Sequence, residues 1–265
     1  MTFLSICVST INERIGQLQK LLETIPEEAE CLLIHQVTDE TDYRETYSSL
    51  KGCRILTQTG KGLSRSRNLA LKEAKGEWVY LCDDDVQLLP GLIEKLEQAV
   101  SDHPECALFR FRIDSTTNTP FKDYPAHSRV LDRSMAGSVS SAEIICKRSA
   151  AEGVSFNESF GLGTSFPSGE EYLFVLDMLF KGHSMWYIPV SIVMHPPEST
   201  GTSFSPAVIR SKGALIRHRF GIAFLLLNLL YAVRKHPVYA QQTGFFAYLK
   251  EIYRGSFQYG RHGRR

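Results

Sequence analysis

Through the first hundred residues, short apolar runs alternate with segments whose apolar residues recur every three or four positions. The apolar runs predict strands at residues 3–10, 30–37, 53–58 and 77–86. The helical spacing predicts helices at residues 16–25, 63–76 and 90–100, with Pro26 and Gly76 closing the first two and Pro90 in the first turn of the third. Strands that alternate with helices are typical of a parallel sheet, and the lack of polar alternation within each run indicates burial on both faces.

The pattern becomes less regular after about residue 105. It predicts strands at 106–113 and 141–148, a helix at 170–182 and either a strand pair or one long strand at 183–195. Residues 114–138 are polar and irregular, and 158–169 are rich in Gly and Ser, so we expect loops there. The irregular middle of the chain is the natural place for loops that bind an acceptor substrate.

The composition is that of an ordinary globular protein, with 43% apolar and 22% charged residues in 265, which excludes disorder and collagen-like repetition. No stretch reaches the roughly 18 consecutive apolar residues of a membrane span. The start of the chain lacks the basic region of a signal peptide, so we expect a cytoplasmic protein. The six cysteines contain no CxxC pair and several lie in apolar runs, so we expect reduced cysteines and no disulfide scaffold.

Charge divides the chain unevenly. Residues 201–265 hold 11 Lys and Arg against one acid, Glu251, a net charge of +10, whereas residues 1–200 carry a net charge of −9. A basic tail indicates an anionic partner, such as membrane headgroups, a nucleic acid or a pyrophosphate-bearing substrate. Its apolar stretch at 220–233 has two interpretations: a core helix that covers the sheet, or a helix that lies on a membrane. The Leu- and Phe-rich centre argues against a nucleic-acid groove.

Three consecutive carboxylates, Asp83, Asp84 and Asp85, end the apolar run at 77–86. Ligands bind beyond the carboxyl ends of strands in open α/β sheets, and adjacent carboxylates repel one another unless a cation is present. Mg²⁺ and Mn²⁺ take oxygen ligands and bridge carboxylates to phosphates, so the run predicts a metal site. The alternative is a solvated acidic turn.

A second motif, GKGLSRSRNLAL at 60–71, places Lys61, Arg65 and Arg67 around a glycine loop and the start of a helix. Such a start favours an anion. Arg65 and Arg67 are two residues apart and do not share a helix face. We expect one of them to reach a phosphate and the other to pair with an acid of the aspartate run; the alternative is an exposed basic turn.

Together these motifs resemble family 2 glycosyltransferases of the bacterial surface-polysaccharide type, which have the GT-A fold. The resemblance is carried by Ser9, Thr10 and Asn12 after the first strand, by GLSRSRNLAL, and by KGEW followed by LCDDDVQLLPG. It implies a Rossmann-like, mostly parallel sheet with flanking helices over 1–200, divided into a nucleotide-sugar-binding half (1–105) and an acceptor-binding half (106–200). A helical basic extension would follow at 201–265.

The resemblance also implies a nucleotide-diphosphosugar donor and a divalent metal, Mn²⁺ or Mg²⁺. Asp83 would lie near the ribose, Asp84 beside it in the donor site, and Asp85 would hold the metal on the diphosphate. Thr10 and Asn12 would lie under the nucleotide. Where the family ends its second strand in paired acids, this chain reads Ile34-His35-Gln36-Val37-Thr38-Asp39, so the Gln36 amide is the candidate partner of a uracil edge.

Two adjacent acids, Glu170 and Glu171, open the helix predicted at 170–182. Acids stabilise a helix start, which explains them without any function. They also resemble the family's Gly-x-Glu-Asp motif, which implies Glu171 as the general base and Glu170 as its support. His195 ends an apolar run before two prolines and is either a structural histidine or a third metal ligand beside Asp83 and Asp85.

The resulting hypothesis is an inverting, metal-dependent sugar transfer from a UDP-sugar to a glycan or a polyprenyl-diphosphate-linked acceptor, with the basic tail on the inner leaflet. A nucleotidyltransferase is the first alternative, although STINERIG at 9–16 is a poor match to the glycine-rich loop such enzymes carry there. A non-catalytic protein that binds sugar nucleotides is the second.

Overall fold

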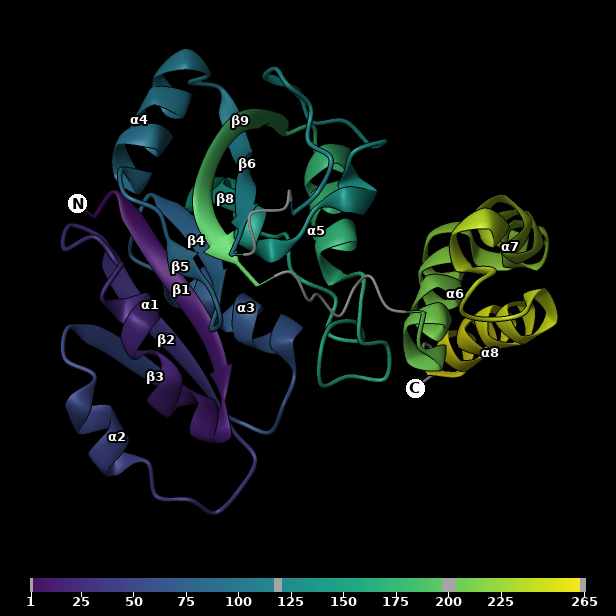
Figure 1. Cartoon of the computed structure of the whole chain (residues 1–265), viewed down its shortest axis with the longest axis horizontal. Helices are drawn as coiled ribbons and strands as arrows, with labels where there is room; N and C mark the ends of the chain where they lie inside the picture. Colours follow the sequence, from purple (N-terminus) through teal and green to yellow (C-terminus); the bar gives the residue numbers. More distant parts are fainter. Residues whose placement is uncertain (1, 117–120, 197–203, 263–265) are drawn as a thin grey trace. The chain divides into compact units, whose positions relative to one another are not determined.

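The computed structural model describes residues 2–116, 121–196 and 204–262. The chain forms two compact units. The sheet unit comprises residues 1–157 and 171–198, and the helical unit comprises residues 158–170 and 199–265 (Figure 1). The segment 158–170, placed with the sheet by sequence analysis, therefore groups with the C-terminal helices.

The sheet unit is built on a nine-stranded mixed sheet. Its strands are β1 (Leu4–Ile11), β2 (Glu30–Val37), β3 (Cys53–Thr59), β4 (Trp78–Asp83), β5 (Gln87–Leu88), β6 (Cys106–Ser115), β7 (Arg129–Val130), β8 (Ile144–Lys147) and β9 (Ser184–His195). The order is β3-β2-β1-β4-β8-β6-β9-β5, with β7 also paired to β9. Strands β1 to β4 pair in parallel, as do β6 and β9, while β8, β5 and β7 run antiparallel to their neighbours.

Helices cover both faces of this sheet, which confirms the prediction from its continuous apolar strands (Figure 1). On β1, Leu4, Ile6 and Val8 join one buried cluster and Cys7 joins the other. The first cluster includes residues of α1 (Gln19–Leu22) and α4 (Leu92–Asp102), and packs partly buried Tyr47 of α2 (Arg44–Ser49). The second includes residues of α3 (Leu63–Glu73) and α5 (Glu170–Phe180). A strand buried on both sides needs no polar face.

Two helix boundaries differ from the prediction. The helix predicted at 16–25 is reduced to the short α1 (Gln19–Leu22), which follows a 3-10 turn, η1 (Asn12–Gln17), that begins before the predicted start. Helix α3 ends at Glu73, before Gly76. A Cβ on Gly76 would lie 2.5 Å from the backbone nitrogen of Ser5, so this glycine permits close packing against β1 instead of capping the helix.

The prediction of reduced cysteines is right for Cys7, Cys82, Cys106 and Cys146, which are free and buried. It is wrong for Cys31 and Cys53, which form a disulfide between β2 and β3. These residues lie opposite each other in the parallel register, with Cα atoms 4.7 Å apart, which is within the range that a disulfide bridges. The pairing depends on strand register, which spacing along the chain does not reveal.

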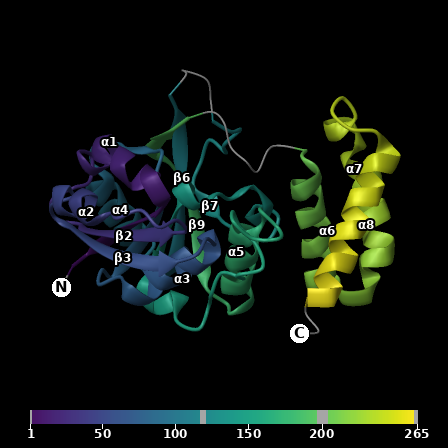
Figure 2. The same ribbon diagram turned by 90° about the horizontal axis from the view of Figure 1, so that it is seen from below.

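The helical unit packs α6 (Pro206–Phe220), α7 (Phe224–Tyr239) and α8 (Phe245–His262) side by side (Figure 2). Glycines bring α6 and α8 into backbone contact. A Cβ on Gly213 would lie 1.8 Å from the carbonyl oxygen of Ile252, and one on Gly255 would lie 2.0 Å from that of Arg210. The close approach is completed by Ser256, whose hydroxyl donates to the Gly213 carbonyl at 2.7 Å.

By length and composition, the helical stretch Pro206–Tyr239 could cross a membrane, with a mean hydropathy of 1.4 over its most apolar window. The sequence analysis expected no segment long and apolar enough to span a membrane, and the length and mean hydropathy of this helical stretch do not support that expectation. The stretch is interrupted at Gly221, which has φ +53° and separates α6 from α7. Phe204, just before α6, approaches Tyr239 at the end of α7, so the two helices run antiparallel.

The segment 158–170 is held within the helical unit by aromatic contacts. The rings of Phe160 and Phe166 lie 5.6 and 5.8 Å from that of Tyr259 on α8. Gly169 packs closely against Leu215 of α6, because a Cβ added to Gly169 would lie 2.5 Å from Cδ1 of Leu215. The next residues along the chain are the candidate acids Glu170 and Glu171.

A buried histidine that the sequence analysis assigns no role lies near the carboxyl end of β2. His35 is fully buried, with Nδ1 2.7 Å from the Tyr47 hydroxyl and Nε2 3.0 Å from the Asn12 carbonyl oxygen. Burial lowers the pKa of His35 below its usual 6.5. A neutral ring satisfies both contacts, since Nε2–H donates to Asn12 and Nδ1 accepts from Tyr47.

We expect Gly213→Ala to lower the free energy of unfolding by about 2–3 kcal/mol, because its Cβ would overlap a backbone oxygen that cannot move independently. Thermal unfolding followed by circular dichroism measures the change. Gly260→Ala, in α8 of the same unit, is the matched control, since its Cβ would meet only the Arg217 side chain at 3.4 Å. Equal stability of the two variants would show that the α6–α8 contact is looser than described.

The free energy of unfolding should also depend on His35. Since its folded pKa is lowered, the unfolded chain takes up a proton between pH 6.5 and the folded pKa while the native state does not, so stability is lost as pH falls through this window. Denaturant unfolding at pH 7.5 and 5.5 should show a smaller loss in His35→Gln, which keeps a donor and an acceptor, by up to about 1 kcal/mol. An identical loss in both proteins would assign the dependence to other groups.

Candidate functional site

The predicted site residues gather where β1, β2 and β4 end. The parallel register sets Thr10 beside His35 and Ile11 beside Gln36, while Ser9 lies beside Asp83. Because these strands run in the same direction, their carboxyl ends share one edge of the sheet. The loops after β1, β2 and β4 therefore meet there, although they lie more than 20 residues apart in the sequence.

The three aspartates differ in their partners, although Arg14 is shared by two of them: it bonds to Asp84 and its Nη2 lies 3.8 Å from Oδ2 of Asp85. Asp83 accepts hydrogen bonds from Arg67 at 3.2 Å and from the Ser141 hydroxyl at 3.0 Å. Asp84 accepts from the Thr10 hydroxyl at 2.8 Å and from Arg14. Asp85 has a side chain that is 47% exposed, and its Oδ1 lies 3.6 Å from Nε2 of His195. The turn after β4 thus separates charges that would otherwise repel one another.

Asp84 is consequently a loop-holding residue in this structure, although the sequence analysis assigns it to donor binding. Its side chain is only 10% exposed. Burial raises its pKa, against the opposing effects of the Thr10 hydroxyl and the Arg14 guanidinium. The exposed carboxylate is that of Asp85, which lies one residue further along the turn.

Arg67 is the centre of the site. It is 3% exposed and donates to Asp83, to the Ser141 hydroxyl at 2.7 Å and to Glu171 at 3.0 Å. Its guanidinium also lies 5.6 Å from the ring centroid of Phe156. The expectation that one of the two arginines pairs with the aspartate run is confirmed for Arg67. A buried cation shared by two carboxylates requires this full set of partners.

The two adjacent glutamates are separated by burial. Glu171 pairs with Arg67 and keeps a side chain that is 17% exposed, whereas Glu170 is 3% exposed. A general base must be reached by its substrate. The exposure therefore favours Glu171 over Glu170, in agreement with the resemblance of this stretch to the family motif.

The glycine loop at 60–62 is held by two glutamines. Gln36 is buried, and its Oε1 accepts from the Gly62 nitrogen at 2.8 Å. Gln58, which the sequence analysis does not single out, donates to the Gly60 carbonyl at 3.3 Å. In this structure the Gln36 carbonyl group therefore supports the loop, where the sequence analysis proposes contact with a base.

Asn12 adopts the left-handed conformation with φ +46°, and its side chain both donates to and accepts from Thr38, at 2.8 and 2.9 Å. This pair joins the loops that follow β1 and β2. Lys61 is exposed, and Arg65 donates to the Thr59 carbonyl at 2.7 Å. These two basic side chains lie on the surface of the glycine loop, and neither joins the aspartate run.

A buried network that the sequence analysis missed orders the part of the sheet unit after residue 105. Glu143 is fully buried and accepts hydrogen bonds from Arg110, Lys122 and Tyr124, the last at 2.6 Å. Burial lowers the pKa of Lys122 and raises that of Tyr124. Glu143 ends the turn η3 (Ser141–Glu143), so the network also positions Ser141 beside Asp83. No motif marks Lys122 or Tyr124, because both lie in the irregular segment.

Asp85 and His195 are the residues that could share a metal ion. Nδ1 of His195 lies 2.6 Å from the Pro196 carbonyl oxygen and donates to it, and Nε2 lies 3.6 Å from Oδ1 of Asp85. Within residues 2–116, 121–196 and 204–262, no group of three or more His, Cys, Asp and Glu side chains is arranged to hold a metal alone. Asp83, the third predicted ligand, is bonded to Arg67 and Ser141.

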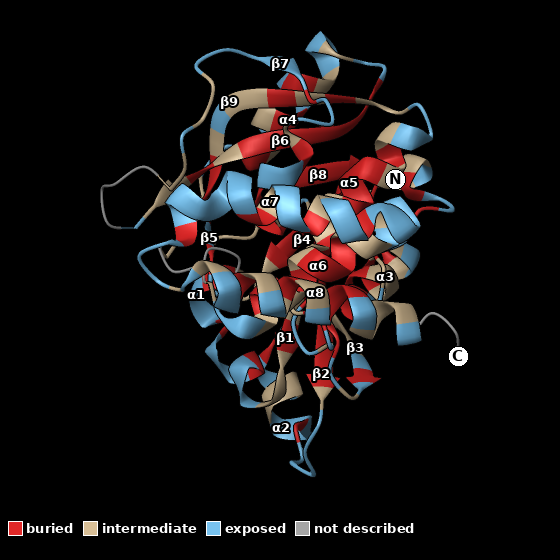
Figure 3. Cartoon of the chain, turned by 90° about the vertical axis from the view of Figure 1, so that its right-hand side faces the viewer, coloured by how far each residue is buried: buried red, intermediate tan, exposed pale blue. Residues whose placement is uncertain are grey.

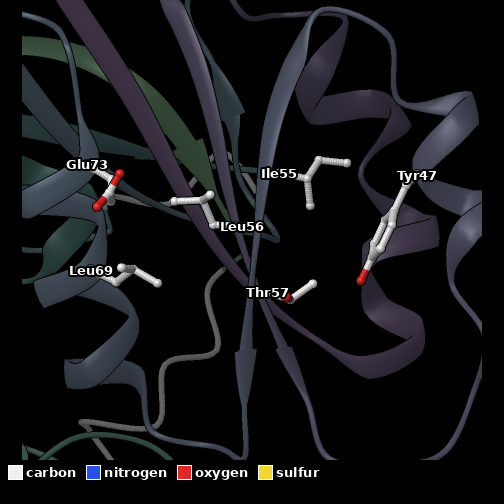
Figure 4. Close-up of a pocket in the computed structure, with 6 residues that line it drawn as sticks. All are labelled: Tyr47, Ile55, Leu56, Thr57, Leu69 and Glu73. Carbon is white, nitrogen blue, oxygen red and sulfur yellow. The ribbon is translucent and has the colours of Figure 1, made fainter.

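A hollow of about 390 Å³ lies elsewhere in the sheet unit, along the edge strand β3 (Figure 4). The lining side chains come from α2, β3 and α3: Tyr47, Ile55, Leu56, Thr57, Leu69 and Glu73. None of the predicted site residues is among them, and the hollow takes no part in the arrangement around Arg67.

Comparison with known proteins agrees with this fold. The crystal structure of S. aureus TarS 1–349 in complex with UDP-GlcNAc superposes with a TM-score of 0.60 at 16% identity, covering 92% of this chain and 75% of that one. Uncharacterized glycosyltransferases of Haemophilus influenzae and Bacillus subtilis (YwdF) are 28% and 29% identical over 105 and 126 residues. These alignments cover 38% and 44% of this chain, and 35% and 47% of the relatives' own lengths.

The profile of the family described as "Glycosyl transferase family 2" matches residues 5–148. This range holds the strand ends, the glycine loop, Arg67 and the three aspartates. The likeness to TarS shows that the sheet unit has the GT-A fold. The chain belongs to glycosyltransferase family 2.

Proposed function

We propose that this glycosyltransferase moves a sugar from a nucleotide-diphosphosugar to a hydroxyl of a glycan or a polyprenyl-diphosphate-linked acceptor, with inversion at the anomeric carbon, in surface polysaccharide synthesis. The observation that carries the proposal is the pairing of Arg67 with both Asp83 and Glu171. Through this pairing, one buried guanidinium positions both Asp83, the proposed donor-side carboxylate, and Glu171, the candidate base. A UDP-sugar is the favoured donor, since TarS of the same fold is solved with UDP-GlcNAc.

On the donor side, Asp85 and His195 would hold Mn²⁺ or Mg²⁺. A carboxylate oxygen and an imidazole nitrogen are ligands suited to Mn²⁺. Bound there, the ion supplies charge neutralisation for the departing nucleoside diphosphate. Asp83, fixed by Arg67 and Ser141, would accept from the ribose, and Thr10 and Asn12 shape the loop beneath the nucleotide.

On the acceptor side, Glu171 acts as the general base. Arg67 holds its Oε1, so that Oε2 takes the proton of the acceptor hydroxyl. The hydroxyl oxygen then bonds to the anomeric carbon from the face opposite the diphosphate, and the bond to the diphosphate oxygen breaks in the same displacement. The products are the glycoside with inverted configuration, the protonated Glu171 and the nucleoside diphosphate.

A panel of UDP-, GDP- and dTDP-sugars with Mn²⁺ tests the reaction by the release of nucleoside diphosphate. We expect release from one donor, and a loss of about 10²-fold or more in Asp85→Asn, because the neutral amide weakens the hold on the cation. Glu152→Gln, an exposed acid on the surface, is the control.

Formation of a sugar nucleotide in this assay would instead identify a nucleotidyltransferase. Donor binding by calorimetry, with no turnover across a panel of glycan and lipid-linked acceptors, would identify a non-catalytic binding protein. Either result would contradict the proposal.

Glu171→Gln should lower kcat by about 10²- to 10⁴-fold while the donor KM changes little, since the amide keeps the contact with Arg67 but cannot take the proton. Glu170→Gln should lower kcat far less, because Glu170 is buried. Steady-state kinetics with the donor identified above measures both. If Glu170→Gln has the larger effect on kcat with an unchanged unfolding curve, the assignment of the base reverses.

A further inference from the structure

Helix α7 exposes an apolar face. Its members follow a spacing of three or four residues from the turn η6 (Gly221–Ala223) into the helix, and their exposures lie between 40% and 73%: Ile222, Leu225, Leu226, Leu229, Leu230 and Val233. Figure 3 shows much of α7 coloured as exposed. We call these six residues the leucine face. An exposed apolar surface of this extent marks an interaction site.

The opposite side of α7 is already partnered within the helical unit. Phe224, Asn228 and Ala232 are buried, and the Asn228 amide donates to the Ser256 hydroxyl at 2.8 Å. The ring of Phe224 lies 5.2 Å from that of Phe257 on α8. The leucine face is thus not the side that holds the three helices together, and it is left for another partner.

Basic and aromatic side chains accompany the leucine face. Arg234 and Lys235 follow it directly along α7 and are exposed. Helix α8 carries a second exposed row at a spacing of three or four residues: Phe246, Lys250, Arg254, Phe257 and Arg261. Residues 201–265 contain one acid, Glu251, which pairs with Arg210 and Arg254, so the helical unit as a whole is strongly positive.

We infer that the leucine face docks the helical unit onto an anionic lipid bilayer. The six apolar side chains would enter the boundary between headgroups and acyl chains, and the arginines and lysines would contact the anionic headgroups. Aromatic residues such as Phe246, which is 82% exposed, suit the same boundary. These two features define the partner. The exposed apolar side chains favour a lipid surface, and the positive charge of the helical unit favours lipids with negative headgroups.

The geometry favours a helix that lies on the membrane. Helix α7 has 16 residues, a length of about 24 Å at 1.5 Å per residue, which is shorter than the roughly 30 Å of the hydrocarbon core. Gly221 turns the preceding α6 back along α7, so the longer apolar stretch does not form one straight rod. The buried side of α7 also carries the polar Asn228, bonded to α8.

A second copy of the chain is the competing occupant of the leucine face. A symmetric dimer through this face would bring two strongly basic surfaces together, and like charges at an interface oppose association. An anionic bilayer supplies the opposite charge. The positive charge of the helical unit therefore decides in favour of the lipid.

Cosedimentation of the full chain with vesicles tests the inference. Binding to vesicles of phosphatidylcholine with 30% phosphatidylglycerol should exceed binding to phosphatidylcholine alone. Leu226→Ser with Leu230→Ser should lower the partition coefficient about tenfold or more, because two inserted side chains are lost. Arg234→Gln with Lys235→Gln should lower it about fivefold for each charge, on the anionic vesicles only.

Val130→Ser on β7 is the matched control, since Val130 is 55% exposed but lies in the sheet unit, and it should bind as the unchanged chain does. Circular dichroism checks that the double variants keep their helix content. Equal binding of the leucine variant and the control would overturn the inference. So would light scattering that shows a dimer, dissociated by Leu226→Ser with Leu230→Ser, together with no binding to anionic vesicles.

Discussion

The guanidinium of Arg67 lies buried between carboxylates that come from two distant segments of the chain. Glu171 is 104 residues away in the sequence and Asp83 is 16 residues away. A buried cation is tolerated only when its charge is balanced and its hydrogen bonds are made, so the partners must be held in place as a set. This requirement ties α3 to the end of β4 and to the start of α5. The position of Asp83 relative to Glu171 follows from it.

The same principle explains how three consecutive aspartates coexist. Each neighbouring carboxylate raises the energy of the others, and the turn after β4 relieves this by directing them toward two arginines and a histidine. Arg67 pairs with Asp83 and Arg14 bonds to Asp84, whereas Asp85 is the most exposed of the three, 3.8 Å from Arg14 and 3.6 Å from His195. The division leaves one carboxylate of the run available for a ligand, while the other two hold the surrounding loops.

The helical unit depends on a different constraint, the close approach of α6 and α8 at Gly213 and Gly255. Aromatic rings from the segment 158–170 pack on Tyr259 of this unit, and the chain continues from that segment into α5. The residue that precedes the candidate base, Glu170, is therefore grouped with the C-terminal helices.

The sequence by itself determined the order of the longer strands and helices of the sheet unit, though not the two-residue strands β5 and β7, and it located the acidic run. These features depend on local periodicity and on chemistry placed at strand ends, which a single chain segment carries. Only the tertiary structure decided that Arg67 pairs with both Asp83 and Glu171. It also turned Gln36 toward the glycine loop and joined Cys31 to Cys53. Such pairings depend on strand register and on which loops meet at one sheet edge. The spacing of residues along the sequence does not show which distant residues lie close together in space. For the same reason the apolar stretch at 220–233 predicts a helix but not its exposed face, since only packing against α8 shows which side remains in solvent.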